Sequence, residues 1–100
     1  MRVEIDRELE DIFPSYLETR KQEVSVYKKY LEQEDFESLR HLGHKIAGNA
    51  GAYGLKQLGV LCRQLEQQAT DKESAACEAT IEAIGIYLMQ VEPIYVDFAD

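Results

Sequence analysis

One histidine of this sequence, His44, stands in a segment whose residue types point to surface chemistry: HLGHKIAGNAGAYG, from His41 to Gly54. A neutral imidazole has a free lone pair on one ring nitrogen, so it can act as a nucleophile, a general base or a metal ligand. The surrounding pattern predicts a helix, in which each glycine costs about 0.8 to 1 kcal/mol relative to alanine. The segment nevertheless contains four glycines: Gly43, Gly48, Gly51 and Gly54. A specific role for these glycines is therefore expected.

Gly48 and Gly51 lie on the same side of the predicted helix as His44. Six positions fall within an arc of about 100° and form the face expected to turn to the core: Leu39, Leu42, Gly43, Ile46, Ala50 and Tyr53. His44 is rotated by about 140° from Leu39 and is therefore expected to face water. The residues nearest to it around the helix are Arg40, Ala47, Gly48 and Gly51. We predict that Ala47, Gly48 and Gly51 provide clearance for a partner that approaches His44.

The small residues of this helix also fit a purely structural interpretation. Gly43, Ala47 and Gly51 follow one another at four-residue steps, and strips of small residues let two helices approach closely. This interpretation explains Gly43, which falls on the core face, but it leaves Gly48 unexplained. We expect Gly43 to serve packing and Gly54 to end the helix.

Two other kinds of site fit the segment poorly. A phosphate-binding loop follows a strand and ends in Gly-Lys-Ser/Thr, whereas here the glycines recur every third residue and neither feature is present. Glu37, His41 and His44 lie on adjoining turns, but the other predicted helices offer no inward histidine or Glu-x-x-His pair to complete a metal site. We therefore expect no metal here. We assign no role to His41. The residues three and four positions after it are the bulkier His44 and Lys45, whereas Ala47 and Gly48 follow His44 at the same spacing.

The elements that must position His44 are predicted to be helical throughout, because long runs of Glu, Lys, Gln, Leu and Ala carry apolar residues at helical spacing. The expected helices are a short one, roughly Asp6 to Ile12, and four longer ones over residues 13–33, 35–53, 55–70 and 71–92. Connections this short place consecutive helices antiparallel. The sequence therefore predicts an all-α fold, an antiparallel up-down four-helix bundle whose short N-terminal helix covers one end. We expect residues 1–100 to form one domain.

Composition and charge narrow the classes of partner. Eleven basic and nineteen acidic residues give a net charge of −8, which disfavours binding to nucleic acid or to anionic membrane surfaces.

Cys62 and Cys77 fall at apolar positions of separate predicted helices, so we expect two reduced, packed thiols. The charged N-terminus does not resemble a signal peptide, and no run of eighteen apolar residues occurs. We expect a cytoplasmic monomer.

The segment HKIAGNAGAYG resembles the signature of histidine phosphotransfer (HPt) domains. In that family an exposed helical histidine is followed by an apolar residue two positions on, a glycine four positions on and further small residues before a closing glycine. The matching residues here are His44, Ile46, Gly48, Gly51 and Gly54. The resemblance extends over EDFESLRHLGHKIAG and into GLKQLGVLCRQLE. The length and the predicted bundle are also similar to the family.

The sequence departs from the family pattern at Ala47, where many members carry a lysine. A phosphohistidine carries close to two negative charges and needs a cation nearby. Arg40 lies one turn before His44 and only about 40° around the helix, so we name it as the candidate cation. Arg63 and Gln67 of the following helix are weaker candidates.

The resemblance implies a function as a phosphorelay intermediate in two-component signalling. His44 would accept a phosphoryl group from an aspartyl phosphate of a response-regulator receiver domain and pass it to the aspartate of another receiver. The chain would then be a phosphoprotein and phosphoryl carrier without kinase activity or a cofactor of its own, and the receiver would supply Mg²⁺. The other expected partner is a hybrid sensor kinase. The alternative is a helical-bundle adaptor that binds signalling proteins without being phosphorylated.

The site should also offer an apolar docking patch for such a partner. We expect the first predicted helix to contribute it through Ile5, Leu9 and Ile12, which share one side of that helix.

Overall fold

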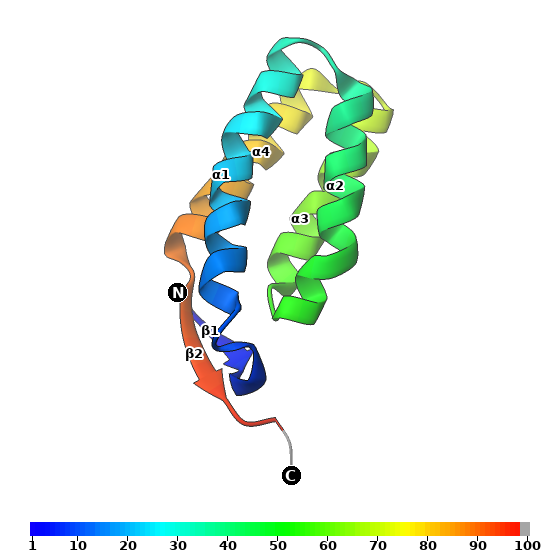
Figure 1. Cartoon of the computed structure of the whole chain (residues 1–100). Helices are drawn as coiled ribbons and strands as arrows, with labels where there is room; N and C mark the ends of the chain where they lie inside the picture. Colours follow the sequence, from blue (N-terminus) through cyan, green and yellow to red (C-terminus); the bar gives the residue numbers. More distant parts are fainter. Residues whose placement is uncertain (99–100) are drawn as a thin grey trace.

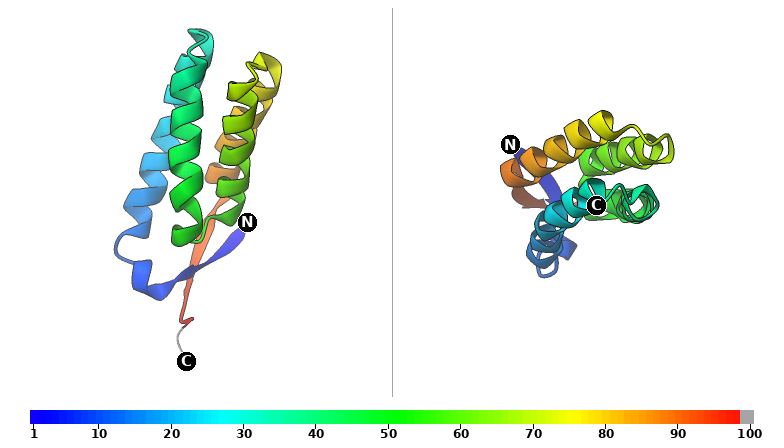
Figure 2. Two further views of the ribbon diagram at one scale, coloured as in Figure 1. Left: turned by 90° about the vertical axis from the view of Figure 1, so that its right-hand side faces the viewer. Right: turned by 90° about the horizontal axis from the view of Figure 1, so that it is seen from above.

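The structure is a computed structural model that describes residues 1–98, and its framework is a bundle of four long helices (Figure 1). Their bounds are α1 Phe13–Glu32, α2 Phe36–Ala50, α3 Lys56–Thr70 and α4 Ser74–Gln90. Consecutive helices run antiparallel, and the view from above shows their four axes around a common core (Figure 2). The predicted up-down four-helix bundle is confirmed. Within the described residues, no helix has the length and apolarity needed to cross a membrane.

The residues at the two ends of α2 explain where this helix begins and ends. The Asp35 carboxylate accepts a hydrogen bond from the Ser38 backbone N–H at 3.1 Å, which caps the helix N-terminus. Hydrogen bonds from the side chain and from the backbone of Ser38 lower the pKa of the Asp35 carboxyl group. A 3-10 turn continues the helix over Gly51–Tyr53, and Gly54 ends it with a φ of +84°, a conformation that favours glycine. The predicted role of Gly54 is confirmed.

Two short strands correct the prediction of a helix from Asp6 to Ile12. The segments concerned are strand β1 Arg2–Asp6, a 3-10 turn Arg7–Leu9 and strand β2 Glu92–Val96. The strands pair in parallel with Ile5 opposite Tyr95, so the fold contains a two-stranded sheet besides its helices. RVEID alternates charged and apolar residues, which suits a strand, but its partner strand lies near the other end of the chain. Only a single turn of the predicted helix remains.

The sheet lies at the end of the bundle where the chain begins and finishes (Figure 1). Ile5 is fully buried there and belongs to the same apolar core as Phe13 and Leu55. Pairing with β2 therefore anchors β1 beside the turn that follows α2.

Helices α2 and α3 pack closely together at Gly43. A Cβ atom at this position would lie 3.1 Å from the backbone carbonyl oxygen of Cys62. The predicted packing role of Gly43 is confirmed. Cys62 and Cys77 are both free and buried, as the sequence predicts, and burial raises the pKa of the Cys62 thiol to about 11.

We expect Gly43→Ala to lower the melting temperature measured by circular dichroism. The added methyl group would press on a helix backbone, and overpacking of this kind costs about 1 to 3 kcal/mol. The higher helix propensity of alanine offsets only about 1 kcal/mol of this loss in stability. Gly48→Ala is the matched control, because a Cβ atom at Gly48 meets nothing within 4 Å, and it should raise the melting temperature. Equal shifts for the two variants would contradict the packing role of Gly43.

The C-terminal half of α2 is held against α1 by aromatic and polar contacts. The rings of Tyr16 and Tyr53 stack with their centroids 3.8 Å apart, and the Tyr16 hydroxyl donates a hydrogen bond to the Asn49 side-chain oxygen. The Arg20 guanidinium lies 4.5 Å from the centroid of the Tyr16 ring. These contacts fix the rotation of α2 and therefore the direction in which His44 points.

Candidate functional site around His44

His44 lies in the middle of α2 and points away from the core. Its side chain is 69% exposed, as the rotation of the helix predicts. Beside it, Cβ atoms added at Gly48 or at Gly51 would meet nothing within 4 Å. These two glycines are therefore not required by packing, and they leave open space on this side of α2.

Ala47 does not lie on this open surface, contrary to the prediction. It is buried in the seam between α2 and α3, where its carbonyl oxygen faces Gly59 across the two helices. The reason is the close approach at Gly43, which brings α3 over the side of α2 that carries Ala47. Its small side chain therefore serves helix packing. The clearance beside His44 comes from Gly48 and Gly51.

A carboxylate that the sequence analysis missed contacts the candidate nucleophile. Glu66 of α3 places Oε2 2.8 Å from Nδ1 of His44. An ionised carboxylate only accepts hydrogen bonds, so Nδ1 carries the proton and donates it. The opposite ring nitrogen, Nε2, is then the one with a free lone pair when the ring is neutral. Glu66 thus fixes both the orientation of the ring and the nitrogen that is available for chemistry.

Arg40, the candidate cation, is paired with Glu37 one turn earlier on α2. Its Nη2 and Nε atoms lie 2.7 Å and 3.3 Å from the two carboxylate oxygens of Glu37. This pairing raises the pKa of the Arg40 guanidinium and lowers the pKa of the Glu37 carboxyl group. The guanidinium is also close enough to Glu66 to feel its charge. Arg40 therefore stands at the edge of the His44 site.

The two histidines of α2 belong to different surroundings. His41 is exposed and lines a shallow hollow with Tyr30 of α1 and with Lys45. His44 instead leans on α3 through Glu66. In the part of the chain that the structure describes, no group of three or more His, Cys, Asp or Glu side chains is gathered as a metal site would require.

The expected apolar docking patch is only partly present. Ile5 is buried under the sheet, whereas Ile12 is exposed and Leu9 is half-buried. Leu9 lines a hollow of about 600 Å³ whose wall includes Gly51 and the exposed Phe98. The apolar side chains of this hollow lie near the sheet, and Ile5 is not among them.

A family model described as "Hpt domain" matches residues 6–92, which is nearly the whole chain. No curated protein and no solved structure matches the chain.

Proposed function

Because this chain belongs to the Hpt domain family, whose members take part in histidine phosphotransfer in two-component phosphorelays, we propose that His44 is its phosphorylated residue. It takes a phosphoryl group from the aspartyl phosphate of one response-regulator receiver domain and passes it to the aspartate of another. The observation that carries this proposal is the geometry of His44: an exposed imidazole with an acceptor on Nδ1 and open surface on its other side.

The proposed transfer forms one bond and breaks one bond. Nε2 of His44 attacks the phosphorus atom of the aspartyl phosphate, and the bond from phosphorus to the aspartate oxygen breaks, so that the aspartate leaves as a carboxylate. Nδ1 keeps its proton throughout, because Glu66 accepts the hydrogen bond from it. The phosphorylated ring is then cationic, and the Glu66 carboxylate stabilises that charge. Onward transfer is the same step in reverse, with a second receiver aspartate as the acceptor.

Charge on the transferring oxygens must also be balanced. Arg40 is the proposed cation on this chain, and it would exchange Glu37 for the phosphoryl oxygens. The receiver is expected to bring Mg²⁺ and most of the catalytic groups, so the chain acts as a carrier and not as a kinase. Gly48 and Gly51 let the loops of the receiver reach the imidazole.

The partners proposed on this basis are receiver domains and a hybrid sensor kinase. With a net charge of −8, the chain is proposed to act as a monomer in the cytoplasm without binding nucleic acid. Residues 1–100 are proposed to act as one domain.

Incubation with a phosphorylated receiver tests this function. We expect radiolabel to move to this chain and to be stable in alkali but lost in acid, which distinguishes a phosphohistidine from an acyl phosphate. The absence of label at every receiver tested would favour the alternative of a non-phosphorylated adaptor.

We expect Glu66→Ala to slow transfer by roughly tenfold to a hundredfold, the loss typical when a group that orients a metal-bound imidazole is removed. Without the carboxylate the ring rotates freely and divides between its two neutral tautomers. The ¹⁵N chemical shifts of His44 report this change directly, apart from activity. Gln64→Ala is the matched control, since Gln64 is an exposed residue of the same helix, whereas the imidazole bonds Glu66. An unchanged tautomer in Glu66→Ala would contradict the role of Glu66.

A further inference from the structure

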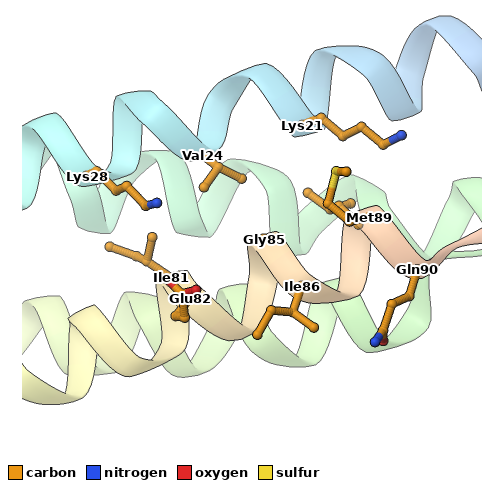
Figure 3. Close-up of a pocket in the computed structure, with 10 residues that line it drawn as sticks. Lys21, Val24, Lys28, Ile81, Glu82, Gly85, Ile86, Met89 and Gln90 are labelled. Carbon is orange, nitrogen blue, oxygen red and sulfur yellow. The ribbon is translucent and has the colours of Figure 1, made fainter.

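A second surface feature lies on the side of the bundle opposite to His44. Helices α1 and α4 pack side by side there, while α2 and α3 carry the His44 site (Figures 1 and 2). Between α1 and α4 runs an open groove of about 460 Å³ (Figure 3). No step of the proposed phosphoryl transfer uses it.

The groove has an apolar floor and one apolar wall. Val24 of α1 packs against Gly85 of α4, where a Cβ atom would lie 3.6 Å from Val24 Cγ1, and Ile81 extends this floor. On the wall, Ile86 is 51% and Met89 is 74% exposed. These two exposed side chains join the floor in one apolar strip, and exposed apolar surface that is contiguous can serve as a contact surface.

The opposite wall is basic, although the chain as a whole is acidic. Lys21 and Lys28 line it from α1 and stand seven residues apart, which is two helical turns or about 10.5 Å. Among residues 1–98, neither lysine has a carboxylate oxygen within 4.0 Å. The two lysines therefore present unpaired positive charge along one side of an apolar groove.

We propose that this groove binds an amphipathic α-helix of a partner protein. Its apolar stripe lies on Val24 and Gly85 between the two walls, and carboxylates seven residues apart on one flank pair with Lys21 and Lys28. Glu82, on the α4 side of the groove, repels an acidic flank and so sets which way the helix faces. Because the groove and His44 lie on opposite sides, the partner can stay bound while a receiver approaches His44.

A second copy of this chain is a poorer occupant than such a helix. Each copy carries a net charge of −8, so two copies repel one another at low ionic strength. The four helices of each copy are also already packed in its own bundle.

Two helix-stapled, fluorescein-labelled peptides of about 18 residues, ~27 Å long as a helix, test the proposal by fluorescence anisotropy. Both carry the same leucine stripe, and they differ only at two flanking positions seven residues apart, which are glutamate in one and lysine in the other. We expect the chain to bind the glutamate peptide at least about tenfold more tightly. Lys21→Glu combined with Lys28→Glu should reverse this preference, and Met89→Glu should weaken binding of the glutamate peptide.

Lys29→Glu combined with Lys72→Glu is the matched control, because it changes the net charge equally with residues that do not line the groove. It should keep the preference for the glutamate peptide. Equal binding of both peptides, or the same reversal in the control, would overturn the proposal. A dimer in sedimentation equilibrium that Lys21→Glu with Lys28→Glu dissociates would assign the groove to a second copy instead. The assay measures binding alone, so its outcome is separate from that of phosphoryl transfer.

Discussion

His44→Gln is expected to abolish phosphoryl acceptance from a receiver, whereas His41→Gln should leave acceptance within about twofold of the wild type. Glutamine has no basic ring nitrogen, so no N–P bond can form at position 44. His41 has the same side chain on the same helix, but it lies on the α1 side, and within residues 1–98 no carboxylate is hydrogen-bonded to its ring. We therefore expect the two histidines to differ in reactivity, because their surroundings differ.

Receiver-dependent labelling over time measures this difference, and circular dichroism checks the fold of both variants. Both positions are exposed, so neither substitution opens a cavity and the melting temperatures should stay close to that of the wild type. Label that persists in His44→Gln and disappears in His41→Gln would show that His41, and not His44, is the phosphorylated residue. Label lost in both variants, with the fold intact, would show that His41 takes part in transfer.

Local pattern accounts for most of what was predicted correctly. The spacing of Leu39 and Ile46 shows which face of α2 turns to the core, and the position of His44 outside that face predicts its exposure. The start of α2 beside Asp35 and its stop at Gly54 depend on residues within a few positions of each helix end. Such features can be read from one sequence because their causes are adjacent in the chain.

The features that were missed depend on contacts between distant segments. Glu66 is one of several polar residues on α3, and only the close approach at Gly43 shows which of them reaches His44. The same approach buries Ala47, because rotation about one helix axis does not tell which side the next helix covers. Strand β1 needs β2 from the far end of the chain to satisfy its backbone, and no local rule pairs them.

Gly48→Gln is expected to slow receiver-dependent transfer by roughly a hundredfold while making the protein more stable. A Cβ atom at Gly48 meets nothing within 4 Å, so glutamine fits the folded chain and gains about 0.8 kcal/mol of helix propensity. Its side chain, however, would stand beside His44 where the receiver must place its aspartate in line with Nε2. A displacement of about 1 Å at that step accounts for a loss of this size.

Phosphoramidate, a donor small enough to pass a glutamine side chain, separates this clearance effect from damage to the imidazole. The Gly48→Gln variant should accept phosphate from phosphoramidate at the wild-type rate and be slow only with a receiver. His41→Gln, which places the same side chain elsewhere on α2, serves as the matched control. If Gly48→Gln were slow with both donors, the glycine would act on His44 itself. If it were slow with neither donor, the open surface would have no part in docking. The lower helix stability at Gly48 would then have no explanation in phosphoryl transfer.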